Sequence, residues 1–314
     1  MKRLLAVLLA VPCLALAQAY PSKPVRLIVP FPPGGTGDLI ARIVQPKFQE
    51  FLGQQLIVDY RGGAGGSIGT LEASKAAPDG YTLLLVFDTH AVNHHIYKLA
   101  PDPAKTLDHI MLMVSSPSLL VGVSGFAPRS LRELVELAKA NPGKVSYATA
   151  GHGSSNHLGA LLLEQNAGIR MTHVPYKGGG PMIQALLGSQ VDIAIMSTPL
   201  ILPQVQAGKV RALAVGGRQR LPQLAEVPTL AETYPGFEQV SWFGLLGPLG
   251  LPKPVSAKIH QDMARTLQDP GTRQRLMDRG FEVIASSPEE FLRFVQDESD
   301  KLGKLVRDNH IRAD

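Results

Sequence analysis

Apolar residues follow two patterns in turn along this chain: short continuous runs, and longer stretches in which they recur every three or four positions. The first run is residues 25–29, Val-Arg-Leu-Ile-Val, and the following stretch, residues 39–52, has apolar residues at helical spacing until Gly53. Short β-branched runs predict buried strands, whereas the longer period predicts an amphipathic helix. A glycine directly after the last periodic residue is typical of a helix end.

The unit of strand, loop and helix recurs along most of the chain. Further strands are predicted at residues 81–87, 145–149, 172–174, 192–196 and 210–215. Ser130 and Glu133 form a capping box at the start of a predicted helix over residues 131–140. The C-terminal part is more helical, with predicted helices over residues 255–267, 272–279 and 288–307. Strands that alternate with helices predict an α/β fold with parallel sheets.

Five loops rich in Gly, Ser, Thr and His leave the ends of predicted strands. They span residues 30–38, 87–93, 149–157, 175–181 and 196–199. In open α/β sheets, ligands bind beyond the carboxyl ends of the strands, so these loops form the candidate binding surface. The length of the chain favours two domains that face each other across a cleft.

The first of these loops, residues 30–38, reads Pro-Phe-Pro-Pro-Gly-Gly-Thr-Gly-Asp. A glycine-rich turn from strand to helix leaves backbone N–H groups bare at the positive end of the helix dipole, which suits an anion. Thr36 or Asp38 is expected to cap the helix. A nucleotide phosphate is disfavoured, because no Gly-Lys-Ser/Thr follows and the glycine-rich residues 62–69 miss the dinucleotide fingerprint at Ile68.

Residues 1–17 are expected to be a secretory signal peptide. A short basic start precedes an apolar stretch, residues 4–16, that is too short to span a bilayer. Small residues then offer cleavage after Ala17 or Ala19. The single cysteine, Cys13, lies in this segment, so the exported chain is expected to be soluble and free of cysteine.

The charge of the chain argues against nucleic acid as a partner. The formal net charge is +5, and it falls to +3 once Lys2 and Arg3 leave with the signal peptide. Basic residues do not cluster and aromatic residues are few. Export and this mild charge together disfavour nucleic-acid binding. No cofactor is expected for this protein.

Eight motifs follow one another along the mature chain. They are residues 21–24 followed by Pro-Phe-Pro-Pro-Gly-Gly at 30–35, Gly-Ala-Gly-Gly-Ser-Ile-Gly at 63–69, Pro-Asp-Gly-Tyr-Thr-Leu at 78–83, Thr-His-Ala-Val-Asn at 89–93, residues 151–157, Val-Pro-Tyr-Lys-Gly at 174–178 and Val-Pro-Thr at 227–229. Any one of them is weak. In series they resemble the Bug family, the periplasmic solute-binding proteins of tripartite tricarboxylate transporters.

The resemblance implies a type II periplasmic-binding-protein fold, in which two α/β domains are joined by a two-strand hinge with the ligand cleft between them. The first crossing strand is expected near residues 113–123 and the return near residues 241–248. Domain one would then be discontinuous, residues 18–121 and 241–314, and domain two would be residues 122–240. Solute would close the cleft by a hinge motion.

The resemblance also implies the ligand and the partners. The ligand would be a small carboxylate solute, an organic acid or amino acid, held by backbone N–H groups and hydroxyls. The partners would be the large and small inner-membrane transporter subunits, and the protein would be a periplasmic monomer and not an enzyme. The expected ligand-binding residues are Phe31, Gly34, Gly35, Thr36, Asp38, Asp88, Thr89, His90, Ala150, Gly151, Ser154, Ser155, Tyr176, Lys177 and Ser197.

Several of these residues have a structural alternative. Asp38 is favoured as a helix cap or loop organiser, since an acid repels a carboxylate, and Lys177 is favoured as pointing to solvent. Asp88 stands where the family usually has a small or hydroxyl residue, and it is favoured as a cap of the helix from Thr89. If it faces the cleft instead, it favours a solute with an ammonium or other donor. His157 is expected to be a structural hydrogen-bonding residue.

Some of the same residues could also support other functions. His90 and His94 are one helical turn apart, with His95 and Asp88 beside them, but no Glu lies between the histidines and no cysteine helps, so no metal is expected. An exported hydrolase could use Ser154 or Ser155, yet no Gly-x-Ser-x-Gly elbow exists and catalytic residues are expected to be absent. A ligand sensor that acts through a membrane sensor kinase remains an alternative. Trp242, near the expected hinge, is favoured as a core residue.

Overall fold

A computed structural model describes residues 20–98, 102 and 105–312. The expected signal peptide and Cys13 lie outside the described residues. Among the described residues, each helix is too short or too polar to cross a membrane.

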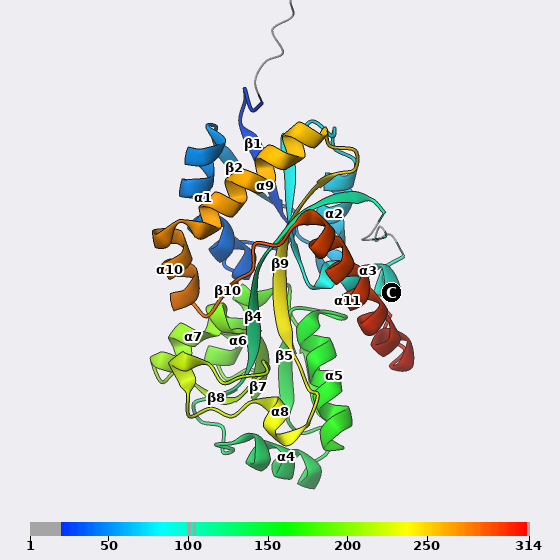
Figure 1. Cartoon of the computed structure of the whole chain (residues 1–314). Coiled ribbons are helices and arrows are strands. Elements are labelled where there is room, and N and C mark those ends of the chain that lie inside the picture. Colours follow the sequence, from blue (N-terminus) through cyan, green and yellow to red (C-terminus); the bar gives the residue numbers. More distant parts are fainter. Residues whose placement is uncertain (1–19, 99–101, 103–104, 313–314) are drawn as a thin grey trace, which may run out of the picture.

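The chain alternates strands and helices as the hydrophobic pattern predicts, and Figure 1 labels them along the chain. The strands are β1 Val25–Val29, β2 Leu56–Tyr60, β3 Thr82–Phe87, β4 Leu107–Val123, β5 Ser146–Thr149, β6 Thr172–Pro175, β7 Ile193–Ser197, β8 Val210–Val215, β9 Val240–Pro248 and β10 Glu282–Val283. The helices are α1 Thr36–Leu52, α2 Ser67–Ser74, α3 Thr89–Ile96, α4 Leu131–Ala140, α5 Ser155–Ala167, α6 Gly179–Leu187, α7 Thr198–Gln206, α8 Leu230–Thr233, α9 Lys253–Gln268, α10 Pro270–Asp278 and α11 Pro288–Asp308.

The strands form two lobes that share two long strands. In the first lobe β1 pairs in parallel with β2 and β3, and in the second lobe β5 pairs in parallel with β6 and β7. The long strands β4 and β9 are antiparallel to each other and run from one lobe towards the other (Figure 1). At Pro117 the strand β4 leaves β9, and from Ser118 onward it pairs with β7 and β8.

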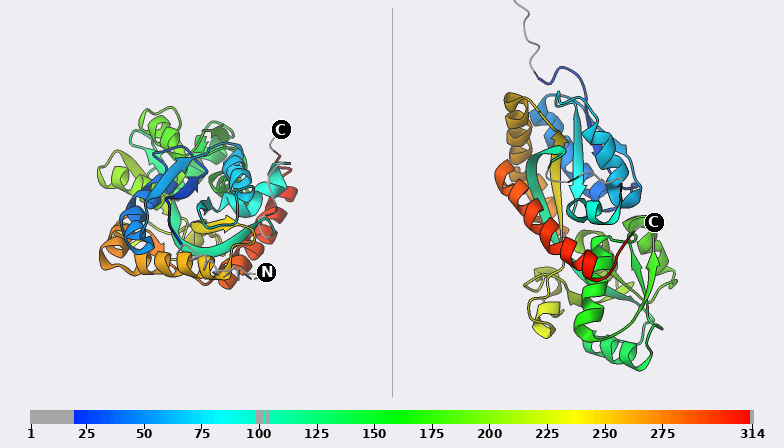
Figure 2. Two further views of the ribbon diagram at one scale, coloured as in Figure 1. Left: turned by 90° about the horizontal axis from the view of Figure 1, so that it is seen from above. Right: turned by 90° about the vertical axis from the view of Figure 1, so that its right-hand side faces the viewer.

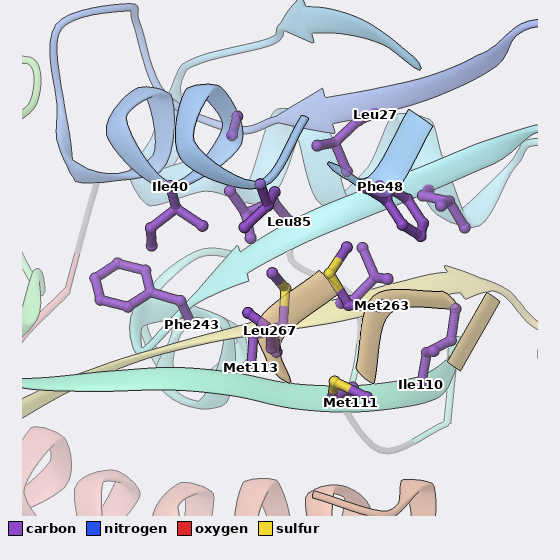
Figure 3. Close-up of a cluster of buried hydrophobic side chains, with 14 of the residues drawn as sticks. Leu27, Ile40, Phe48, Leu85, Ile110, Met111, Met113, Phe243, Met263 and Leu267 are labelled. Carbon is purple, nitrogen blue, oxygen red and sulfur yellow. The ribbon is translucent and has the colours of Figure 1, made fainter. Parts of the chain in front are cut away.

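Each lobe has its own hydrophobic core. In the first lobe, side chains from β1, β3, β4 and β9 meet those of α1 and α9, and Figure 3 shows this cluster. Two clusters fill the second lobe on the two sides of its sheet. The cores explain the sequence pattern, because parallel strands covered by helices on both faces must be apolar throughout.

The C-terminal helix α11 makes a further contact between the lobes, beyond the two shared strands. It packs against β4 and ends beside α5 (Figure 2). Val306 and Ile311 pack with Leu158 of α5, and the Gln165 side chain donates a hydrogen bond to Asn309 at 2.7 Å. This helix therefore adds to the contact that the hinge strands make between the lobes.

Two predicted helix caps are wrong in detail. Helix α1 has Gly35 as its N-cap and no side-chain cap, so neither Thr36 nor Asp38 caps it. At α4 the Ser130 hydroxyl accepts from the Glu133 N–H, as expected, but the Glu133 carboxylate accepts from the Arg129 N–H at 2.8 Å. The capping box is therefore only half formed.

Candidate functional site

A cavity of about 70 Å³ lies between the two lobes, at the carboxyl ends of the strands. All five loops singled out in the sequence contribute to its wall. Its lining residues are Phe31, Pro32, Pro33, Gly35, Thr36, Phe87, Asp88, Thr89, Ala150, Ser154, Ser155, Asn156, Lys177, Gly178, Gly179, Gly180, Pro181, Met182, Met196, Ser197, Leu200, Ser241 and Phe243. The cavity therefore lies where ligands bind in open α/β sheets.

Five helices begin at this cavity. The first residue or the N-cap of each lines the wall: Thr36 of α1, Thr89 of α3, Ser155 of α5, Gly179 of α6 and Ser197 before α7. The first N–H groups of a helix have no partner within it, and the helix dipole places partial positive charge at this end. Five such ends around one small cavity favour a negatively charged group.

Hydroxyl and aromatic side chains close the cavity. The Thr36 and Ser197 hydroxyls are 2.6 Å apart and form a hydrogen bond from the first lobe to the second. On the first-lobe side, the ring of Phe31 lies 4.6 Å from that of Phe87, which in turn lies 5.2 Å from that of Phe243. The wall thus offers hydroxyl groups and an apolar floor.

Asp88 is the acid at the cavity, and it is buried, with 6% of its surface exposed. Burial raises its pKa to about 6, although the Ser155 and Ser241 hydroxyls and the Thr89 N–H favour the charged form. It occupies the N-cap position of α3 without the side-chain hydrogen bond typical of a cap. A carboxyl with this pKa exchanges its proton near neutral pH, so it can present either a donor or an anion to a solute.

Ten of the fifteen residues expected from the sequence line the cavity: Phe31, Gly35, Thr36, Asp88, Thr89, Ala150, Ser154, Ser155, Lys177 and Ser197. Lys177 lines the wall and is also exposed to solvent, so its contact with a solute stays a prediction. The other five residues, Gly34, Asp38, His90, Gly151 and Tyr176, are not among the lining residues.

Asp38 holds the glycine-rich loop in place through a hydrogen bond to its backbone. Its carboxylate accepts hydrogen bonds from the Gly34 N–H at 3.0 Å, from Arg42 at 2.7 Å and from the Tyr60 hydroxyl. Burial opposes the charge, but the bonds from Tyr60, Gly34 and Arg42 outweigh it and hold the pKa of Asp38 below its usual value. Gly34 and Asp38 therefore shape the loop whose next residues reach the cavity.

The remaining three residues are held by their own lobes. Gly151 has a φ of 125°, and its carbonyl accepts from the Ser154 hydroxyl at 2.7 Å. Tyr176 packs against the core of the second lobe. His90 is buried in the first turn of α3.

The serine and histidine residues of the loop before α5 are used structurally. The Ser154 hydroxyl caps α5 by accepting from the His157 N–H, and the His157 Nδ1 atom accepts from the Gly153 N–H at 3.1 Å. His157 is thus a hydrogen-bonding residue, as expected, and burial followed by the nearby His152 lowers its pKa to about 4. No hydrogen bond between the side chains of a serine and a histidine links residues 151–157, so this loop has no nucleophile–base pair.

Two of the three histidines of α3 lie side by side, next to α11. The rings of His94 and His95 lie 3.8 Å apart, tilted against each other, and both lie beside Ser299 of α11. Within the described residues, the group of three candidate metal ligands is instead His152, His157 and His173.

Several lining residues were missed by the sequence analysis as site residues. Gly178, Gly179, Gly180 and Pro181 belong to a loop that the sequence did mark, and Asn156 belongs to another. Ser241 and Phe243 were expected only as part of the hinge strand. Trp242, between them, is 1% exposed and is absent from the wall, as expected of a core residue.

Comparison with known proteins gives consistent matches. The model of the tripartite tricarboxylate transporter family receptor matches residues 40–311. The protein BugT of Bordetella pertussis (strain Tohama I) is 33% identical over 296 residues, which cover 93% of this chain and 91% of that protein.

Two solved structures match over nearly their whole length. Rpa4515 of R. palustris, solved with adipate, has a TM-score of 0.90 and 31% identity and covers 94% of this chain and 100% of that one. MatC (Rpa3494) from Rhodopseudomonas palustris, with bound malate, has a TM-score of 0.87 and is 32% identical. That match covers 91% of this chain and 100% of the MatC chain.

Proposed function

The chain belongs to the family of tripartite tricarboxylate transporter receptors, which are periplasmic solute-binding proteins, and on that premise we propose that it binds a short carboxylate between its two lobes. The observation that carries the proposal is the set of five helix N-termini around one cavity. Carboxylates are bound in the structures of two relatives, adipate in Rpa4515 and malate in MatC.

The expected ligand-binding residues that line the cavity act in three ways. The N–H groups of Gly35, Thr36 and Ser155 hold the carboxylate, helped by the dipoles of α1 and α5. The hydroxyls of Thr89 and Ser197 orient it, with bridging water where the reach is too long. Ser154, whose hydroxyl bonds to the Gly151 carbonyl and the His157 N–H, shapes the end of α5 at the wall. Lys177 adds positive charge at the entrance, and Phe31 with Ala150 contacts the carbon skeleton. Asp38, Gly34, Gly151, His90 and Tyr176 support this wall from behind.

The size of the cavity favours a short solute. A water molecule needs roughly 10–15 Å³ on this scale of volume, so 70 Å³ is room for about five waters. Malonate or succinate suits this space better than adipate does. We therefore expect affinity to fall along the dicarboxylate series as the chain lengthens.

Asp88 selects a solute that also carries a hydrogen-bond donor. A buried carboxylate repels a second carboxylate but attracts an ammonium or hydroxyl group. A solute with one carboxylate at the helix N-termini and a donor facing Asp88 satisfies both ends of the cavity. Hydroxy acids and amino acids meet this requirement.

The mode of action follows from two lobes that share a hinge. Domain one is residues 18–121 with 241–314, and domain two is residues 122–240, with β4 and β9 as the hinge strands. Solute stabilises the closed arrangement, which the large and small inner-membrane transporter subunits recognise. The protein acts as a periplasmic monomer, exported through a cleaved signal peptide, and it releases its solute unchanged.

A thermal-shift screen tests the proposal. The chain from Gln18 is unfolded and refolded to remove retained solute, then heated with dicarboxylates of increasing length, hydroxy acids, and acidic and neutral amino acids. A solute at a hundred times its Kd adds about 2.7 kcal/mol to the free energy of unfolding. For a chain of this size, each kcal/mol raises the Tm by roughly 2–4 °C. Stabilisation by short acids supports the proposal, and absence of any shift across the panel refutes it.

The variant Asp88→Ser tests the donor requirement separately. We expect it to lose its preference for amino acids or hydroxy acids over plain dicarboxylates. If the ranking of the solutes is the same in both proteins, Asp88 does not select the solute.

A further inference from the structure

Three histidines meet on the second lobe, behind the loop that lines the cavity. His152 lies in the loop before α5, His157 in the first turn of α5 and His173 in β6. One possible ligand atom from each lies within 4.8 Å of the other two. In the part of the chain that the structure describes, no other three His, Cys, Asp or Glu side chains are grouped in this way.

Ring stacking holds His173 more firmly than the other two histidines. The His173 ring is stacked on Tyr147 at 5.1 Å and on His157 at 4.1 Å. The His173 Nε2 atom also pairs with the Thr149 hydroxyl at 2.5 Å, which leaves its Nδ1 atom available. His152 is exposed, lies edge-on to both other rings and makes no hydrogen bond through its imidazole with the described residues.

We infer that His152, His157 and His173 bind a divalent transition-metal ion such as Zn²⁺ or Ni²⁺, and that binding releases the Gly153 backbone from His157. Three imidazoles with an open fourth position are a known ligand set for Zn²⁺, and imidazole also suits Ni²⁺ and Cu²⁺. Tetrahedral ligands at Zn–N distances of about 2.05 Å are about 3.3 Å apart. Nitrogens now up to 4.8 Å apart must therefore approach by roughly 1.5 Å at most. The exposed His152 can turn towards the ion, and the His157 ring must tilt off His173, because the lone pairs of two parallel rings do not point at one ion.

The release of Gly153 follows from the chemistry of the neutral imidazole ring. The His157 Nδ1 atom accepts from the Gly153 N–H, so the ring proton is on Nε2. A metal at Nδ1 takes the lone pair that Gly153 uses. A metal at Nε2 requires the proton to move to Nδ1, which can then no longer accept. Either nitrogen of His157 can serve as the ligand only if the bond from Gly153 breaks.

The loop released in this way touches both the first lobe and the solute cavity. Gly153 is packed so closely on Ile96 of α3 that an added Cβ would lie 2.2 Å from that side chain. The Tyr97 hydroxyl donates to the His152 carbonyl at 3.2 Å, and Ser154, the next residue, lines the cavity. Metal binding therefore acts on a contact between the lobes, which couples it to solute binding in both directions.

Titration calorimetry with ZnCl₂ and NiCl₂ tests the metal site. The chain from Gln18, without a histidine tag and after treatment with chelator, is compared with His152→Asn and with His310→Asn as the matched control. His152 and His310 are both exposed, so neither change is expected to impair folding. We expect one ion per chain, binding weakened roughly tenfold or more by His152→Asn, and no change in the control.

Three results would overturn the inference. Wild-type protein that takes up neither ion has no site, and equal binding by His152→Asn and wild type places the ion elsewhere. The loop release is tested by the amide resonance of Gly153 in a nitrogen-15 NMR spectrum, which is expected to shift when Zn²⁺ binds. Binding of the ion with this resonance unmoved contradicts the release.

Discussion

At the scale of single residues, Asp88 combines features that oppose each other. It is a buried acid in a cavity built from helix N-termini, and burial raises its pKa although Ser155 and Ser241 favour the charged form. Such a group costs stability when it is ionised. The residue that we propose selects the solute is therefore expected to weaken the fold at neutral pH.

The pH dependence of stability tests this cost. The pKa of Asp88 is about 6 in the folded protein, against 3.8 when unperturbed, so between these pH values the folded state holds a proton that the unfolded state has released. The bound proton contributes about 3 kcal/mol to the free energy of unfolding below about pH 4. This contribution is lost as the pH rises through about 6.

The variant Asp88→Asn cannot ionise and keeps a side chain that suits an N-cap. We expect its Tm to exceed that of the wild type at pH 8, with a gap that narrows as the pH falls to 4.5. Parallel Tm profiles of the two proteins over this range would contradict the assignment.

The residue scale also limits what the sequence could predict. The motif at residues 30–38 marked the right loop, but it could not separate Thr36, which lines the cavity, from Asp38, which supports the loop. The difference depends on Tyr60 and Arg42, which bind the Asp38 carboxylate from another strand and the next helical turn. Pairing across distant segments leaves no local pattern.

At the scale of elements, the hydrophobic pattern predicted most strands and long helices, and the exceptions have local causes. Helix α7 begins with Thr198 and Pro199 and contains Pro203, so its composition suggested only a turn, although proline is well suited to the first helical turn. Strand β4 begins at Leu107, six residues before the predicted start at Met113. The early part was obscured by Asp108, whose carboxylate accepts from the Gly250 and Leu251 N–H groups.

Gly244 is the point where α11 packs on the hinge strand β9. A Cβ there would lie 2.2 Å from the ring of Phe291, which is fully buried. We expect Gly244→Ala to push α11 outward and to cost about 1–3 kcal/mol, which lowers the Tm by several degrees. Gly125→Ala is the control, because no atom lies within 4 Å of its added Cβ. Equal Tm values for the two variants would mean that α11 is not held tightly here.

At the scale of the whole molecule, the structure has two lobes, two shared strands and one helix that crosses them. The Thr36–Ser197 hydrogen bond and the contact of α11 with α5 both join the lobes, one inside the cleft and one behind it. A hinge motion that opens the cleft must break the first bond. The family resemblance predicted the architecture as a whole, whereas composition and periodicity alone reached only an α/β fold with a cleft.

Trp242 provides a direct signal for this motion. It is the single tryptophan, it lies on β9, and its ring meets Phe291 and Phe294 of α11 edge-on at 5.8 and 5.4 Å. Because Trp242 is buried and does not line the cavity between the lobes, a solute bound in that cavity changes its emission through movement of the protein. We expect emission to change as a stabilising acid is titrated, with a midpoint that matches its calorimetric Kd. Constant emission at saturating acid would argue against hinge closure.

The central claim is that helix N-termini recognise a carboxylate in the cavity between the lobes. Titration calorimetry of the refolded chain with lactate and with lactamide tests it most directly, because both solutes carry the hydroxyl donor and share their shape but only lactate carries negative charge. We expect heat of binding with lactate, one molecule per chain, and none with lactamide. Equal binding of both, or binding of the amide alone, would contradict the claim.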